Sequence, residues 1–166
     1  MPFPKINPLR LNHSLENLGR IGHTENGMQR VAFSALDVEG RAHTIEMMRR
    51  VGLTVRIDPA GNIIGSKDGS ESSLTPIALG SHIDTVPNGG KYDGTLGVMG
   101  ALECMLTLQE QNITTRHPLE VLVFTNEEGT GFPHWLFGSR AMSGALSPED
   151  LTAVDHDGVG LETRLQ

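Results

Sequence analysis

A strand–helix–strand pattern in the middle of the chain constrains the fold more than any other feature. Residues 77–80 form a short apolar run, typical of a strand buried on both faces, and residues 119–124 form a second one. Residues 96–108 between them are almost all apolar, and we expect a helix that is buried on most sides. This order predicts a βαβ unit with parallel strands and a right-handed crossover.

The segment before this unit predicts further helices and a strand. Apolar residues recur at spacings of three and four from Leu11 to Ile21, which is typical of an amphipathic helix. Ser34 is placed to cap a second helix that runs to about Arg50. Residues 53–57 alternate between apolar and polar, as a half-buried strand does.

The remaining segments connect and follow these elements. Residues 58–62 have the composition of a turn, and residues 63–64 restart extended structure. After residue 138 we expect short helices and loops, with helix starts near residues 147–150 and 161–166. The chain is therefore predicted to be an α/β protein with a mostly parallel sheet and flanking helices.

Composition excludes several classes of partner. The 13 basic and 20 acidic residues give a net charge of −7, which disfavours nucleic acid and anionic membranes. No run approaches about 18 apolar residues, and residues 1–20 lack the apolar core of a secretory signal. Cys104 is the one cysteine, so no disulfide framework is possible and we expect a cytoplasmic location.

His82 and Asp84 follow the first strand of the βαβ unit. Residues two apart in a strand share a face, so the Asp84 carboxylate is placed to accept a hydrogen bond from one ring nitrogen of His82. The other nitrogen would then be free for a metal. The alternative is a histidine and an aspartate exposed at the end of a strand.

Asp93 and the Glu127–Glu128 pair complete the group of candidates. Asp93 precedes the apolar helix, where it would cap the helix, bridge two cations, or do both. Glu127 and Glu128 follow the second strand directly. Two adjacent carboxylates at the end of a buried strand repel each other unless a cation is present, although such a pair also occurs in solvated turns.

These candidates converge on one edge of one βαβ unit, which predicts a metal site. Their nitrogen and oxygen donors suit Zn²⁺ or Mn²⁺, with Co²⁺ or Ni²⁺ as possible substitutes. A phosphate-binding loop is excluded, because Tyr92 follows Lys91 where Ser or Thr is required and Asp84 stands where the first glycine is required. His134 follows the Glu127–Glu128 pair closely and could face the same site, but we expect it to be packed or exposed to solvent. We expect residues 135–137 to belong to the core.

Several motifs resemble those of the M20-type dinuclear metallohydrolases. Within this family they are most similar to those of the amidase, hydantoinase and carbamoylase group, which includes N-carbamoyl-L-amino-acid hydrolases, allantoate amidohydrolases and β-ureidopropionases. The resemblance extends from about residue 15 to residue 146. It is carried by residues 80–86, 88–90, 92–94 and 126–130, and further by residues 58–62 and 138–144.

The resemblance implies a role for each candidate residue. His82 matches a terminal ligand of one of two divalent metal ions, Asp93 the bridging ligand, and Glu128 a ligand of the second metal. Glu127 matches the general base that activates a bridging water, and Asp84 matches the carboxylate that positions the histidine.

The implied reaction is hydrolysis of a linear, non-peptide C–N bond in a small ureido substrate of the N-carbamoyl-L-amino-acid or allantoate type. Two alternatives stay open. One is an aminoacylase or exopeptidase of the same superfamily that cleaves amides. The other is a truncated, non-catalytic fragment that binds metal.

The chain is much shorter than members of the group. We therefore expect residues 1–166 to form the N-terminal part of the catalytic domain, without the lid or dimerisation domain through which the full-length protein would form a homodimer. The resemblance implies two further histidine ligands downstream. Each metal would have at most two protein ligands here, so we expect weak binding and no activity from this chain alone.

Overall fold

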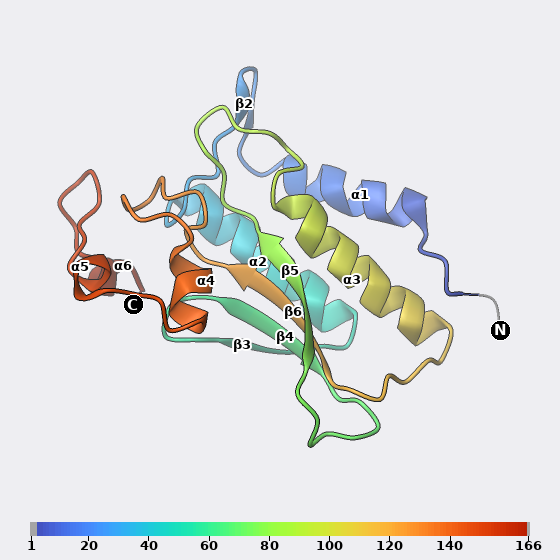
Figure 1. The fold of residues 1–166 in the computed structure, drawn as a ribbon. Coiled ribbons are helices and arrows are strands. Elements are labelled where there is room, and N and C mark those ends of the chain that lie inside the picture. Colours follow the sequence, from blue (N-terminus) through green and yellow to red (C-terminus); the bar gives the residue numbers. More distant parts are fainter. Residues whose placement is uncertain (1–2, 166) are drawn as a thin grey trace.

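The structure is a computed structural model that describes residues 3–165 (Figure 1). Six helices and six strands follow one another along these residues. They are α1 (Pro8–Gly19), β1 (His23–Thr24), β2 (Gly27–Met28), α2 (Ala35–Arg50), β3 (Thr54–Ile57), β4 (Ile63–Lys67), β5 (Ile77–His82), α3 (Thr95–Glu110), β6 (Leu119–Phe124), α4 (Phe137–Met142), α5 (Pro148–Leu151) and α6 (Leu161–Leu165).

The four longer strands form one sheet in the order β3-β4-β6-β5. Strands β5 and β6 are parallel, in a register that pairs Ile77 with Leu119 and His82 with Phe124. The two other pairings, β3 with β4 and β4 with β6, are antiparallel. The α/β class with flanking helices is confirmed, but the sheet is mixed rather than mostly parallel. The tight turn after β3 forces an antiparallel return, which only a longer crossover avoids.

Helix α3 connects β5 to β6, so the predicted βαβ unit is confirmed. The predicted helix starts upstream and downstream are also present. The Ser34 side chain accepts the main-chain N–H of Asp37 at the start of α2, and Ser147 and Asp150 form a capping box at α5. Helix α6 begins at Leu161, and Gln166 lies outside the described residues.

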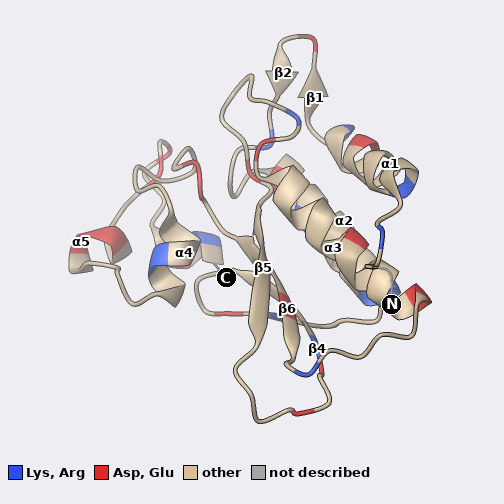
Figure 2. Cartoon of the chain, turned by 45° about the vertical axis from the view of Figure 1, so that its right-hand side comes forward, with Lys and Arg blue, Asp and Glu red and all other residues tan. Residues whose placement is uncertain are grey.

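One face of the sheet carries the main core. Helices α2 and α3 pack against this face, and α1 lies against both helices (Figure 1). Helix α3 carries hardly any charge in Figure 2, as its apolar sequence requires. The fully buried side chains from these elements include Leu18, Met48, Ile63, Val98, Met105, Val121 and Val123. Burial of each such side chain stabilises the fold by about 1.5–3 kcal/mol.

Strand β5 lies at the edge of the sheet, and the prediction that it is buried on both faces is wrong. Ile77 is 50% exposed and Ala78 is exposed, because β6 is the one strand of the described residues that pairs with β5. The adjacent flank of α3 is also open, with Leu96 51% exposed. An apolar run shows that a segment favours burial, but not whether a neighbour covers it.

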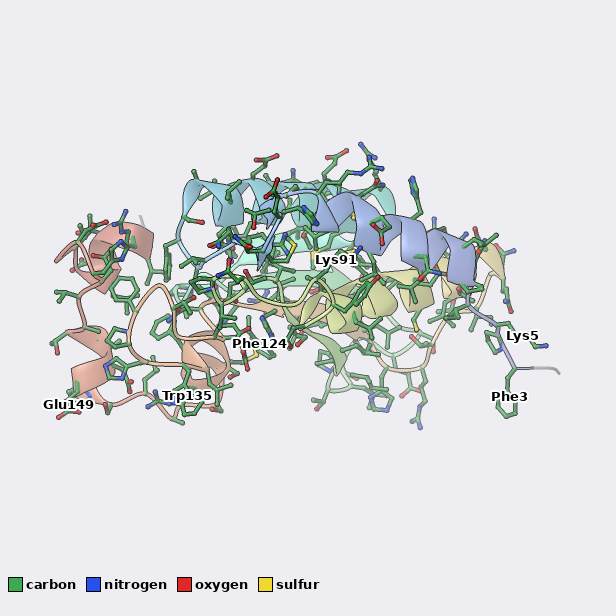
Figure 3. All side chains as sticks on the ribbon, turned by 90° about the horizontal axis from the view of Figure 1, so that it is seen from above. Phe3, Lys5, Lys91, Phe124, Trp135 and Glu149 are labelled. Atoms are coloured by element: carbon green, nitrogen blue, oxygen red, sulfur yellow. The ribbon has the colours of Figure 1, made fainter. Side chains whose placement is uncertain are left out.

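The segment after β6 packs as a smaller unit around a second apolar cluster. Phe132, Phe137 and Leu161 are its buried members, and the ring of Phe33 meets that of Phe132 edge to face with centroids 5.2 Å apart. Phe137 is core, as predicted, but Leu136, which is 43% exposed, and Trp135 are not. The Trp135 side chain lies on the outside of the molecule and is 72% exposed (Figure 3).

No helix within residues 3–165 is long and apolar enough to cross a membrane.

Candidate active site

His82 is the last residue of β5, and its side chain is buried at the point where β5 and β6 end together. Gly80, two residues earlier, has φ +151°, and a Cβ atom there would collide with the main-chain oxygen of Leu122. A glycine is therefore required for β5 to approach β6 this closely just before the histidine. The parallel pairing then carries the segment after β6 to the His82 ring.

The two ring nitrogens of His82 face different partners. Nδ1 lies 2.9 Å from the main-chain oxygen of Asp84 and 3.7 Å from its carboxylate, so the predicted carboxylate hydrogen bond is replaced by one to the carbonyl. A carbonyl oxygen can only accept, so the neutral ring carries its proton on Nδ1. Nε2 is then left with a free lone pair. It lies 3.4 Å from Oε2 of Glu127 and 3.8 Å from Oδ1 of Asp93.

The Asp84 carboxylate instead holds the segment that follows β6. Its two oxygens accept the main-chain N–H groups of Glu127 and Glu128 at 3.3 and 3.1 Å. Burial raises the pKa of Asp84 to about 6, while His82 and these two N–H groups oppose the rise. Asp84 therefore joins the ends of both strands, a role that its spacing from His82 did not indicate.

Asp93 and Gly94 lie against the open side of the imidazole. The Asp93 side chain is 67% exposed, and it does not cap α3, whose N-cap is Gly94 with no side-chain hydrogen bond. The predicted capping role is therefore wrong. Gly94 has φ +62°, and a Cβ atom there would lie 2.5–2.6 Å from three atoms of the His82 ring. This glycine lets the backbone lie flat against the histidine.

Glu127 and Glu128 are half-buried and repel each other across the same space. Burial raises the pKa of Glu128 above its ordinary value, His82 lowers it, and the carboxylates of Asp93 and Glu127 raise it further. Three acidic groups thus gather near one imidazole, and no Lys or Arg ion pair to any of them is found within the described chain. Such a cluster favours a cation.

Two asparagines within the motifs hold the backbone around the cluster, and sequence reasoning assigned them no role. Asn126 is buried with φ +49°, and its side chain accepts the N–H of Gly131 and donates to the oxygen of His134. Asn62 accepts the N–H of Thr125 at 3.0 Å and donates to Asp58. Their burial and their place beside the end of β6 identify them as residues that support the site, whereas their spacing in the sequence does not.

A model of peptidase family M20/M25/M40 matches residues 78–163, just over half of the chain. The chain belongs to this family. The matched segment contains His82, Asp93 and the Glu127–Glu128 pair.

This M20 chain is similar to N-carbamoyl-L-amino-acid amidohydrolases and to amidases of the hydantoinase/carbamoylase family. It is 46% identical to an N-carbamoyl-L-amino-acid amidohydrolase of Pseudomonas sp. (strain NS671) over 93% of the chain and 37% of the relative. It is 42% identical to an N-carbamoyl-L-amino acid amidohydrolase of Geobacillus stearothermophilus over 92% of the chain and 37% of the relative. A hydantoinase/carbamoylase family amidase from Burkholderia ambifaria superposes with a TM-score of 0.95 at 38% identity, over 99% of the chain and 41% of that structure. The M20 chain thus spans well under half the length of these proteins.

The donor types around His82 fit a divalent metal ion. Two ligands of a tetrahedral zinc ion lie about 3.4 Å apart when each bond is about 2.1 Å long. The distance of 3.8 Å from His82 Nε2 to Oδ1 of Asp93 lies just beyond this value. Among residues 3–165, no three His, Cys, Asp or Glu side chains are gathered closely enough to hold an ion. The structure thus brings the donors to one place without assembling a complete ligand set.

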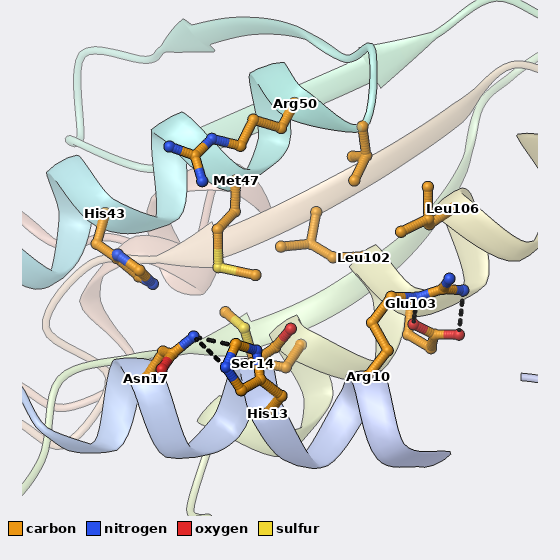
Figure 4. A pocket seen from close by; sticks show the side chains of 12 residues that line it. Arg10, His13, Ser14, Asn17, His43, Met47, Arg50, Leu102, Glu103 and Leu106 are labelled. Atoms are coloured by element: carbon orange, nitrogen blue, oxygen red, sulfur yellow. Dashed lines mark hydrogen bonds and ion pairs between the residues drawn. The ribbon is translucent and has the colours of Figure 1, made fainter. Parts of the chain in front are cut away.

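A separate cavity lies on the helical side of the M20 chain, among α1, α2 and α3 (Figure 4). It has a volume of about 250 Å³, and its wall includes Met47, Leu102 and the side chain of His43. None of the candidate site residues lines this cavity. The cavity is therefore separate from the candidate active site.

Proposed function

We propose that this chain supplies the N-terminal part of the catalytic domain of a metal-dependent amidohydrolase. The proposed reaction is hydrolysis of a ureido C–N bond in an N-carbamoyl-L-amino acid or an allantoate-type substrate. The observation that carries the proposal is the convergence of His82 Nε2 with the Asp93 and Glu127 carboxylates at the joined ends of β5 and β6. The similarity to N-carbamoyl-L-amino-acid amidohydrolases supports the substrate class.

We assign the metal ligands to His82, Asp93 and Glu128. His82 would offer Nε2, because Nδ1 is engaged by the Asp84 carbonyl. Asp93, the most exposed of the three, has both carboxylate oxygens available to bridge two ions. When bound, two Zn²⁺ or Mn²⁺ ions would polarise the substrate carbonyl and lower the pKa of a shared water.

Glu127 is the proposed general base. Its carboxylate is half-buried and lies on the Nε2 side of His82, where the reacting water would be held. It would take a proton from that water and deliver it to the leaving nitrogen. The Asp84 carboxylate fixes the backbone of Glu127 and so sets the reach of this side chain.

The test is a chimera in which this chain replaces the aligned segment of the Pseudomonas relative. We expect the purified, metal-loaded chimera to release amino acid from N-carbamoyl-L-amino acids, and we expect the 166-residue chain alone to bind metal weakly without turnover. A folded, metal-loaded chimera without activity would instead favour a non-catalytic metal-binding fragment. The cytoplasmic location and the homodimer of the full-length protein stay predictions.

A further inference from the structure

Arg30 is a fully buried cation close to the proposed site, and the proposed reaction gives it no role. It lies between β2 and α2 with none of its surface exposed. Its guanidinium meets main-chain carbonyls rather than a carboxylate. Nε donates to the oxygen of Ile83 at 2.7 Å, and Nη1 donates to the oxygens of Leu18 and Ile21 at 3.1 and 2.6 Å.

The main chain of Arg30 also holds the other side of Asp84. Its N–H donates to the Thr85 hydroxyl at 3.0 Å, and its carbonyl accepts the N–H of Thr85 at 2.9 Å. Arg30 therefore contacts the residue before Asp84 and the residue after it. Strand β5 ends at His82, so this segment has no neighbouring strand to align it. Arg30 takes the place of such a neighbour.

The surroundings of Arg30 are shaped to admit this side chain. Gly40 lies inside α2, where glycine is a poor helix former, and a Cβ atom there would lie 2.6 Å from Cδ of Arg30. The planar guanidinium reaches carbonyls from two separate segments at once, whereas the ammonium group of a lysine is a compact point donor at the end of a flexible stem. The position is therefore built for arginine, not for positive charge alone.

We propose that Arg30 is a positioning residue for His82. By holding Ile83 and Thr85, it fixes the Asp84 carbonyl against Nδ1 of His82 and thereby keeps the lone pair of Nε2 directed at Glu127 and Asp93. The consequence for metal binding rests on the proposed function, whereas the consequence for the imidazole does not. A merely structural role would leave the protonated nitrogen of His82 unchanged.

The deciding measurement is the ¹⁵N NMR spectrum of the histidine rings in the metal-free chain above neutral pH, with His82 assigned by comparison with His82→Gln. We expect the wild type to carry its proton on Nδ1. Arg30→Lys, Arg30→Met and Thr85→Val, which removes only the hydroxyl contact, should each give a mixture of the two tautomers. Met48→Ala, a core change in α2 that removes none of these hydrogen bonds, should lower thermal stability and keep the wild-type tautomer.

A second measurement is the affinity for Mn²⁺ by calorimetry, which should fall about tenfold or more in the Arg30 variants, as it does when the partners of a ligating histidine are removed. The proposal is overturned if the wild-type ring is not protonated on Nδ1, or if the folded Arg30→Lys or Thr85→Val variant keeps the wild-type ring spectrum. If wild-type chain binds no Mn²⁺, the proposed function fails while the NMR result still decides the role of Arg30.

Discussion

The carboxylate of Asp84 accepts the main-chain N–H of Glu128 at 3.1 Å, and so ties the end of one parallel strand to the acidic pair that follows the other. The same residue offers its carbonyl to His82 at 2.9 Å. A single buried residue, Asp84, thus orients both the imidazole of His82 and the acidic pair.

Asp84 gives the metal-free chain a definite pH dependence. Burial raises its pKa in the folded state to about 6, above the value of about 3.9 in an unfolded chain. Between these values the folded state binds more protons than the unfolded state, so the free energy of unfolding falls as pH rises. We expect the wild type to lose up to about 3 kcal/mol relative to Asp84→Asn between pH of about 4 and pH of about 6.

Urea unfolding of both proteins across this range measures the difference, which should be flat above pH of about 7. A wild type that instead gains stability relative to Asp84→Asn would show that the two N–H donors outweigh burial and depress the pKa.

Gly94 should be intolerant of a side chain because it lies against the His82 ring. A methyl group there would meet the imidazole at 2.5–2.6 Å, on a backbone with φ +62°. We expect Gly94→Ala to reduce the free energy of unfolding by about 1–3 kcal/mol and to shift the His82 ring signals. Gly90→Ala is the matched control, since a Cβ atom there meets nothing within 4 Å. Equal effects of the two substitutions would contradict the contact.

Glu127 and Glu128 should separate catalysis from metal binding in the active chimera. Glu127→Gln removes the group proposed to accept the proton, because an amide cannot act as a base, and we expect turnover to fall by at least about 10²-fold with metal retained. Glu128→Gln should lower metal content. Metal analysis and the rate of N-carbamoyl hydrolysis distinguish the two. Loss of metal in Glu127→Gln would instead show that Glu127 is a metal ligand. The test is sharp because Glu127 lies only 3.4 Å from Nε2 of His82.

Arg10 links α1 to α3 through two glutamates of very different burial. The side chain of Glu103 is 3% exposed and that of Glu110 is 53% exposed, and both accept hydrogen bonds from the same guanidinium. We expect Glu103→Gln to lower the free energy of unfolding by about 2–4 kcal/mol, because it removes the charge of a nearly buried ion-pair partner of Arg10. Glu110→Gln should lower it by under about 1 kcal/mol. Similar losses in denaturant unfolding would show that burial does not set the strength of this link.

The local elements could be predicted from sequence because their signals lie within a few residues. The Ser34 cap, the apolar helix α3 and the convergence of His82 with the acidic pair all follow from such patterns and from βαβ geometry. The exposure of Ile77 could not be predicted, since it depends on which strand lies beside β5. The carbonyl partner of His82 and the place of Arg30 depend on backbone direction and on contacts between distant segments, which spacing does not encode.

Calorimetric titration of the purified chain with Zn²⁺ or Mn²⁺ tests directly whether His82, Asp93 and Glu128 bind a metal ion. We expect weak, saturable binding that is lost in His82→Ala, Asp93→Asn and Glu128→Gln and kept in Asp157→Asn, an exposed acid outside the cluster. A wild-type chain that gives no binding heat, or cluster variants that bind as the wild type does, would contradict the assignment of these three residues as metal ligands.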